Sequence, residues 1–224
     1  MEESMNTRRI FQAITVVFLS VATVLAAPPP GAPTVNDPEA WVGLDAQAIE
    51  RVKKGEIVVL GDGGSTEGAG TQAMIKAAFI VDVNIAEAYR ILRETEKQYE
   101  YTAGSDKNVL ITRTETYDIV EFVTKYLTVE LHYRVKHQWD NKKFKMWWAL
   151  DPTFKNDFKK LEGSYNLFYL DDNHTLIRYG TILVVSEFAP KAIQTVLVKR
   201  DLPNGLEDVR KRINSHGTYK KKGK

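Results

Sequence analysis

The side chains best suited to hold a small molecule recur at every second position of several alternating runs in the second half of the chain. Residues two apart in a β-strand point to the same face of the sheet. We expect water on the face that carries Arg134, Asn166 and Arg178. The opposite face then presents the candidate ligand-binding side chains Leu131, Tyr133, Met146, Trp148, Tyr165, Tyr169 and Tyr179.

This inner face has two interpretations. Tyrosine hydroxyls in an apolar pocket are polar groups that orient a bound ligand. The same side chains could instead pack against one another as a solid core. The neighbouring tryptophans divide between the faces: Trp148 points inward, and Trp147 points outward, where it needs cover from a lysine stem, a partner or a membrane.

A charged side chain joins the candidates in the run from Val109 to Tyr117. Arg113, Glu115 and Tyr117 share one phase of this run, and a row of threonines occupies the other. Because a row of threonines is typical of a solvent-facing surface, we expect Arg113 and Glu115 to point inward together with Tyr117. A buried charge at Arg113 would have to be paired or bound to the polar group of a ligand. The alternative is that Arg113 lies in water at the rim of the sheet.

The residue types argue against most catalytic and metal chemistry. The chain has no cysteine, which excludes disulfides, thiolate nucleophiles and cysteine metal sites. His132 and His137 fall in opposite phases of one predicted strand, and no histidine pair has metal-ligand spacing. A Gly-x-Ser-x-Gly nucleophile motif is also absent. We therefore predict no metal, no cofactor and no recognisable catalytic residue.

Charge gives little indication of a macromolecular partner. The formal net charge of +2 is too small to predict nucleic-acid binding. Basic residues gather at the end of the chain, where residues 217–224 are expected to form a disordered tail. A peripheral membrane contact through Trp147 and this tail is the alternative to a fully solvated end.

The first 26 residues resemble an export signal. Arg8 and Arg9 precede an apolar run that ends in small residues at Ala26, where we expect cleavage of a signal peptide. An uncleaved anchor is the alternative. Because the segment partly resembles a twin-arginine signal, the export route stays open. The expected location is the periplasm or the exterior of the cell.

The next segments predict a linker and then the opening elements of a domain. Residues 27–44 are rich in proline and are expected to be an extended linker without a core. A short helix is predicted over 45–54, strands over 57–60 and 72–83, and a glycine-rich loop between the strands that lacks the ending of a phosphate loop. Asn84 and Glu87 form a capping box for a helix that should end near Tyr99.

The rest of the chain predicts an antiparallel meander and a final helix. Alternation predicts strands at about 109–119, 125–139, 143–150, 163–170 and 175–187, with Asp-Asn, Asp-Pro and Asp-Asp-Asn turns between the later ones. Pro190 opens a long C-terminal helix that Pro203 should kink.

This order of elements resembles the START-like helix-grip superfamily, also called SRPBCC. The resemblance extends from Gly55 to Ile213, and its local matches are the segments 55–59, 77–81, 80–89, 161–167, 174–179, 188–190 and 202–203. Tyr89 and Tyr165 stand where many members have tryptophan, which leaves the subfamily open. The resemblance implies an α+β fold for residues 45–216, with a curved antiparallel β-sheet wrapped around a long C-terminal α-helix and a cavity for an apolar ligand.

The resemblance and the residues together support three functional hypotheses. The first is an exported carrier of a hydrophobic small molecule, such as a lipid, a quinone or a polyketide-like compound. The second is a cyclase-type or aromatase-type enzyme of the same superfamily. The third is a solid-core domain that acts through surface contacts.

Overall fold

The computed structural model describes residues 27–60, 72–126, 129–185 and 202–222, so the predicted export signal and the glycine-rich loop lie outside the described residues. The described strands form one antiparallel sheet in the order β1-β2-β8-β7-β6-β5-β4-β3. The strands are β1 (Val58–Leu60), β2 (Gln72–Val81), β3 (Ser105–Arg113), β4 (Tyr117–Tyr126), β5 (Val129–Asp140), β6 (Lys145–Leu150), β7 (Phe158–Asp171) and β8 (His174–Val185).

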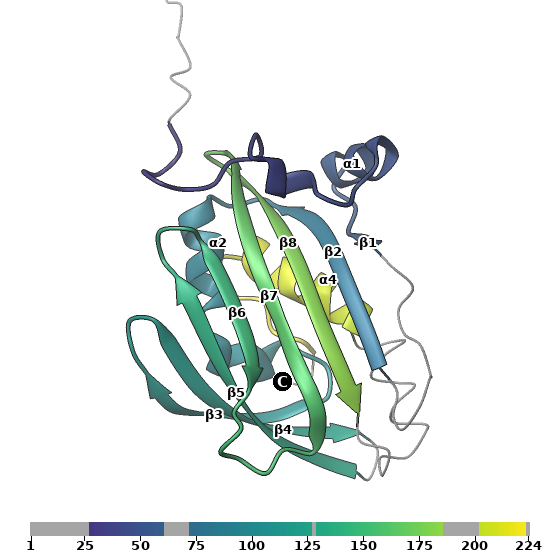
Figure 1. The fold of residues 1–224 in the computed structure, drawn as a ribbon, viewed down its shortest axis with the longest axis vertical. Helices are drawn as coiled ribbons and strands as arrows, with labels where there is room; N and C mark the ends of the chain where they lie inside the picture. The colour runs from purple at the N-terminus through teal and green to yellow at the C-terminus, as the bar shows by residue number, and fades with distance from the viewer. Residues whose placement is uncertain (1–26, 61–71, 127–128, 186–201, 223–224) are drawn as a thin grey trace, which may run out of the picture.

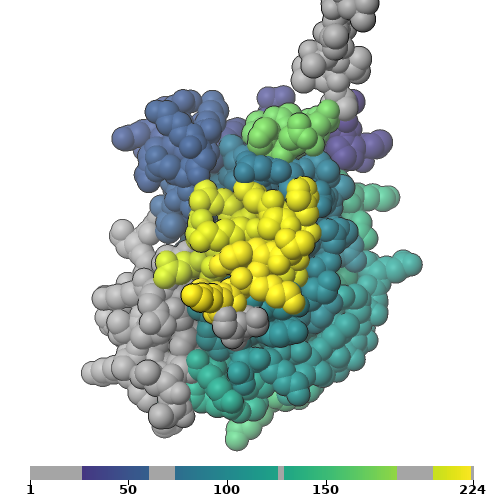
Figure 2. Space-filling model, turned by 180° about the vertical axis from the view of Figure 1, so that it is seen from behind, coloured from purple at the N-terminus to yellow at the C-terminus, as the bar shows by residue number. Residues whose placement is uncertain are grey.

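The helices gather mainly on one face of this curved sheet (Figure 1). They are η1 (Pro38–Trp41), α1 (Ala46–Lys53), α2 (Ile85–Leu92), η2 (Thr95–Glu100) and α4 (Leu202–Asn214). Seen from behind, α4 and the residues after it lie across the middle of the molecule (Figure 2). The main core lies between these layers, where Phe79 and Leu167 of the sheet pack against Ile85 of α2 and Leu206 of α4. The predicted α+β class and helix-grip arrangement are confirmed.

No helix within the described ranges combines the length and the apolarity that crossing a bilayer requires. Of the predicted C-terminal helix, the structure describes the part from Leu202 onward, and the predicted start at Pro190 lies outside the described residues.

Helix α2 begins as the sequence predicts but ends earlier. The Asn84 side chain accepts a hydrogen bond from the N–H of Glu87 at 2.9 Å, as expected of an N-cap. The helix stops at Leu92, not near Tyr99, and the 3₁₀-helix η2 follows. At this break the Arg93 carbonyl accepts a hydrogen bond from the Arg113 guanidinium at 3.0 Å. A contact from a strand distant in sequence therefore fixes the point at which the helix ends.

The predicted single strand over 109–119 is wrong, because the chain turns within it. Strand β3 ends at Arg113 and β4 begins at Tyr117, so six described strands replace the five predicted in this half of the sheet. The hydroxyl of Thr114 closes the turn by accepting from the N–H groups of Thr116 and Tyr117 at 3.3 and 3.1 Å. A threonine can replace Asn or Asp in this role. The turn therefore contains no glycine or proline, and nothing in the sequence marked it.

The segments at both ends of the described chain pack onto the domain instead of extending into solvent. In the expected linker, Ala40 is fully buried and Thr34 pairs with Tyr169 of β7. In the expected disordered tail, the N–H of Lys221 donates to the carbonyl of Glu100 at 2.9 Å. Both segments thus contribute contacts that their composition did not predict.

A row of directly paired residues runs across the sheet on the face toward the helices. Its members follow the strand order from β3 to β8: Arg113, Asp118, His137, Trp148, Gly163 and Thr181. A Cβ atom at Gly163 would overlap the ring of Trp148 and the carbonyl oxygen of Gly180. The absent side chain at Gly163 therefore lets the indole of Trp148 lie over β7.

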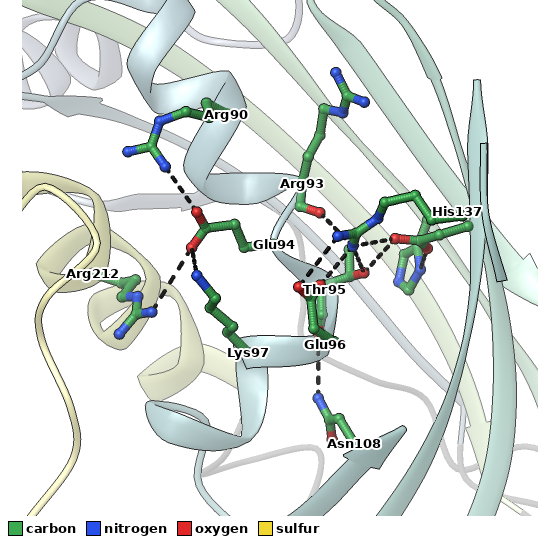
Figure 3. A network of polar contacts seen from close by, with 11 residues as sticks. Arg90, Arg93, Glu94, Thr95, Glu96, Lys97, Asn108, His137 and Arg212 are labelled. Carbon is green, nitrogen blue, oxygen red and sulfur yellow. Dashed lines mark hydrogen bonds and ion pairs between the residues drawn. The ribbon is translucent and has the colours of Figure 1, made fainter. Parts of the chain in front are cut away.

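The other end of this row is a polar cluster built on Asp118, which is fully buried. Three members of this cluster, Thr95, Glu96 and His137, are labelled in Figure 3. Its carboxylate accepts hydrogen bonds from the Thr95 hydroxyl at 2.6 Å and from the Arg113 guanidinium at 2.8 Å. The other carboxylate oxygen bonds to Nδ1 of His137 at 2.8 Å. Arg113 also pairs with Glu96 of η2. One carboxylate thus joins η2 to strands β3, β4 and β5.

The surroundings of Asp118 change its ionisation. Burial by itself would raise the pKa of this carboxyl, but its hydrogen bonds and the charge of its partners outweigh burial and hold the pKa below its usual value. The folded state therefore favours the ionised carboxylate. The resulting stabilisation is fully present above the pKa of the unfolded chain and is lost as the pH falls through the folded pKa.

We predict that Asp118→Asn lowers the free energy of unfolding by about 3 kcal/mol at neutral pH, because a buried ion-pair network loses its charged centre. The difference from the wild type should narrow below about pH 4, where the carboxyl of the unfolded chain takes up its proton. Urea unfolding at several pH values measures both effects.

Asp106→Asn is the matched control for this experiment, because the Asp106 carboxylate pairs with Lys125 and is half exposed. It should change stability little, since exposed ion pairs contribute little. Equal losses for the two variants at neutral pH, or a loss that persists unchanged in acid, would contradict the role of Asp118.

We also predict that Gly163→Ala destabilises the fold by about 1–3 kcal/mol, because the added methyl group displaces Trp148 or the backbone of β8. Gly180→Ala is the control, since a Cβ there meets no atom within 4 Å. Thermal unfolding and tryptophan emission spectra measure the two effects. A Gly163 variant as stable as the Gly180 variant would show that Trp148 does not depend on this gap.

Candidate functional site

A cavity of about 170 Å³ lies between the sheet and the helical layer. Strands β4 to β8 supply one side of it, and the end of η2 and the start of α4 supply the other. The described residues that line it are Gln98, Tyr101, Thr102, Phe122, Tyr133, Val135, His137, Met146, Trp148, Leu161, Tyr165, Tyr179, Thr181, Gly205, Leu206 and Val209.

The described lining is mostly apolar and aromatic. Among these residues there is no Lys, Arg, Asp or Glu side chain, so no permanent charge faces the cavity from them. Met146, Leu206 and Val135 supply aliphatic surface, and Trp148 supplies the largest aromatic surface. A mostly apolar pocket with a few polar groups is typical of sites for small organic ligands.

Trp148 lies at the centre of an aromatic group. Its ring centroid is 5.2 Å from that of Tyr165 and 5.9 Å from that of Tyr179. The two tyrosine rings are 5.1 Å apart. These separations are typical of favourable aromatic pairs, so the rings hold one another in place and form a rigid wall.

The tyrosine hydroxyls at the cavity are held in their protonated form. Burial raises the pKa of Tyr179 to about 12. Burial also raises the pKa of Tyr165 well above its usual value, and the neighbouring hydroxyls of Tyr179 and Tyr101 add to the rise. A protonated hydroxyl can donate a hydrogen bond, and no described residue bonds to that of Tyr165. Tyr165 therefore offers a donor to a molecule in the cavity.

His137 is the residue at this site that sequence reasoning set aside. The side chain is 4% exposed, and its Nδ1 bonds to Asp118 at 2.8 Å. The opposite edge of the ring, with Nε2, has no hydrogen-bond partner among the described residues. The sequence carried a signal for this placement, because His137 shares the phase of Tyr133 and Val135 in strand β5.

The predicted inward residues divide into two groups in the structure. Five of them line the cavity: Tyr133, Met146, Trp148, Tyr165 and Tyr179. Trp147 points outward and is 36% exposed, as the alternation of β6 predicts. The period-two pattern therefore located the sheet face that forms the cavity wall.

The other four predicted site residues lie outside the cavity. Arg113 is not among the lining residues, because its guanidinium holds Asp118 and Glu96. Its side chain is 32% exposed, so the alternative of a position in water describes it only in part. The ring of Tyr117 lies 4.7 Å from the ammonium of Lys136.

Leu131 and Tyr169 have the expected phase but lie too far along their strands. Leu131 packs in a separate cluster with Phe158, Leu183 and Val185. The Tyr169 hydroxyl donates to Asp172 at 2.9 Å, at the opposite end of β7. Strand phase indicates the face of a side chain but not its position along the curved sheet.

Several cavity residues were not among the sequence candidates. Tyr101 and Leu206 come from the helical layer, whose position over the sheet no alternation pattern indicates. Phe122 comes from β4, the strand that the sequence did not separate from its neighbours. In the part of the chain that the structure describes, no group of three His, Cys, Asp or Glu side chains could hold a metal ion.

Comparison by sequence identifies no relative: no protein-family model matches the chain. No curated protein matches it either.

Comparison by structure finds many similar folds. An aromatase/cyclase from a Streptomyces species aligns with a TM-score of 0.54 at 12% identity, over 63% of this chain and 93% of that one. A lipid transfer protein fragment of the STAR-related class from Xanthomonas axonopodis aligns with a TM-score of 0.52 at 10% identity, over 68% and 99% of the two chains.

A third similar structure is a START superfamily protein from Mycobacterium smegmatis. It aligns with a TM-score of 0.51 at 12% identity, over 63% of this chain and 97% of that one. Identities this low establish the architecture alone. The chain therefore has the START-like helix-grip fold that its sequence resembles, with a curved antiparallel sheet packed against a C-terminal helix.

Proposed function

We propose that the protein binds an apolar, ring-bearing small molecule in the cavity between the sheet and the helices. The observation that carries this proposal is the cavity itself, about 170 Å³ in volume, with mostly apolar walls and a Tyr165 hydroxyl that has no hydrogen-bond partner among the described residues. Space of this kind favours a bound ligand over a solid core.

The volume indicates the size of the molecule. Cavities of about 150 Å³ admit benzene, whereas pockets for drug-sized ligands measure about 300–1,000 Å³. The space of about 170 Å³ beside the described lining residues therefore suits one small ring system. Among the predicted ligand classes, a quinone ring or a ring of a polyketide-like compound fits better than an extended acyl chain.

The physical basis of binding is burial of the ring against apolar walls. Each Å² of apolar surface removed from water contributes about 25 cal/mol, before the cost of ordering the ligand. Trp148 and Met146 supply such surface. A hydrogen bond from Tyr165 to a carbonyl or hydroxyl oxygen of the ligand then sets its orientation.

The similar structures support this class of function without choosing within it. One is named as a lipid transfer protein and another as an aromatase/cyclase. Both names suit a fold that encloses an organic molecule. A carrier and an enzyme would both begin by binding such a molecule in the cavity. The predicted export to the periplasm, and a membrane contact through the exposed Trp147, remain proposals beside this one.

We predict that the full chain binds 2-naphthol with a dissociation constant on the order of 0.1 mM, as ligand efficiency indicates for a molecule of this size. Val135→Phe should weaken binding at least about tenfold, because the added ring occupies part of the cavity. Isothermal titration calorimetry measures the affinity, and a negative heat-capacity change should accompany burial of the ring.

Val109→Phe is the control, because it makes the same substitution on strand β3 at a side chain that is 37% exposed. It should leave the affinity unchanged. Absence of binding in the wild type would contradict the proposal. Equal binding by both variants would place the ligand outside this cavity and would contradict it too.

A further inference from the structure

We propose that the cavity is also a site of acid–base catalysis, in which His137 removes a proton from a carbon atom of the bound molecule. Asp118 acts as a positioning residue behind it. This inference rests on the proposed function, because the substrate must enter the same cavity. The chemical class of substrate is a small ring compound whose C–H bond is weakened by an adjacent carbonyl group.

Asp118 orients the imidazole of His137. Nδ1 bonds to the buried Asp118 carboxylate at 2.8 Å, so that nitrogen carries the proton and Nε2 holds the free electron pair of the neutral ring. Nε2 has no described partner, and His137 lines the cavity. A buried carboxylate that fixes the tautomer of a histidine in this way prepares the ring to act as a base.

The described lining holds no second base beside His137. No Lys, Asp or Glu is among the described residues that line the cavity. The tyrosine hydroxyls there are protonated, because burial raises the pKa of Tyr165 and of Tyr179. Among the described lining residues, His137 is thus the one side chain with a basic nitrogen.

Several contacts hold Asp118 in place. Thr95 and Arg113 bond to the same carboxylate, and Arg113 is itself held by Glu96. Because elements on several sides hold the carboxylate, it cannot turn away from His137 without breaking these contacts. A base held by a second shell of this kind meets the requirement for a preorganised site.

The geometry also supplies a hydrogen-bond donor for the charge that develops. His137 pairs with Trp148 across β5 and β6, and Tyr165 contacts the Trp148 ring from β7, with ring centroids 5.2 Å apart. The base and the Tyr165 hydroxyl therefore come from the two strands that flank β6. A carbonyl oxygen held by Tyr165 would gain negative charge during the reaction and strengthen that hydrogen bond.

The proton transfer balances without a further reactant. The C–H bond breaks, its proton goes to Nε2 of His137, and its electron pair forms the carbon–carbon double bond of an enolate. The carbonyl π electrons move to the oxygen held by Tyr165. The imidazolium then returns the proton to a carbon of the enolate, which gives an isomer or the original compound. No oxidant, reductant or second substrate is consumed.

The test uses 5-nitrobenzisoxazole, a ring compound that opens when a base removes its carbon-bound proton. The C–H electron pair forms a nitrile, the N–O bond breaks, and a coloured cyanonitrophenolate leaves. We expect the full chain to accelerate this reaction with saturation kinetics. His137→Gln should lower kcat/KM by about 100-fold or more, the usual contribution of a general base. His132→Gln, at an exposed histidine of the same strand, should leave the rate unchanged.

The pH profile and the Asp118→Asn variant test the roles separately. The wild-type rate should rise with pH, because only a neutral imidazole can accept a proton. Among the described residues, the Asp118 carboxylate on β4 contacts His137, with Arg113 and Glu96 behind it, and the titratable side chains that line the same cavity are Tyr101, Tyr133, Tyr165 and Tyr179. Asp118→Asn should lower kcat by a larger factor than it raises KM, because the imidazole of His137 is no longer held in one tautomer, and urea unfolding checks that the variant is folded in the assay.

The outcomes separate this inference from the proposed function. Binding of 2-naphthol by His137→Gln shows that the variant is folded, so its loss of turnover supports the inference. A wild type that binds 2-naphthol but does not open 5-nitrobenzisoxazole overturns the inference and leaves the binding function intact. A His137→Gln variant with an unchanged rate also overturns it. A wild type that neither binds nor reacts overturns both proposals.

Discussion

The buried carboxylate of Asp118 is the interaction on which the geometry of the cavity depends. Its hydrogen bonds reach Thr95 in η2, Arg113 in β3 and His137 in β5. A buried charge is stable only when such partners compensate for its lost hydration. The contact therefore fixes where η2 lies over the sheet. Because Tyr101 follows directly after η2 and lines the cavity, the same contact sets one cavity wall.

A missing side chain shapes the opposite wall. Gly163 leaves room for the indole of Trp148, which contacts Tyr165 and Tyr179 from neighbouring strands. The polar cluster of Asp118 and the aromatic group around Trp148 thus lie on two sides of the same cavity. An apolar wall with a fixed donor and a fixed base suits binding and proton transfer equally, because both require groups that hold their positions before the ligand enters.

Local patterns in the sequence predicted most elements and the direction of most side chains. Alternation placed Tyr133, Met146, Trp148, Tyr165 and Tyr179 on the inner face, where all five line the cavity. The pattern succeeds because a strand repeats every two residues whatever its partners are. The turn at Thr114 was missed because a single hydroxyl closes it, and many threonines in strands look the same in sequence.

The sequence by itself determined the order of elements, the inner face of the sheet and a resemblance to the helix-grip fold, since these follow from short-range periodicity and turn chemistry. The tertiary structure alone decided the roles of Arg113 and His137. Arg113 was the favoured charged ligand contact, but the pairing of β3 with β4 directs it to Asp118. His137 was set aside as unpaired, but the pairing of β4 with β5 places it beside that carboxylate. Contacts between residues distant in sequence decide which strands pair, so a local sequence pattern cannot predict the pairs.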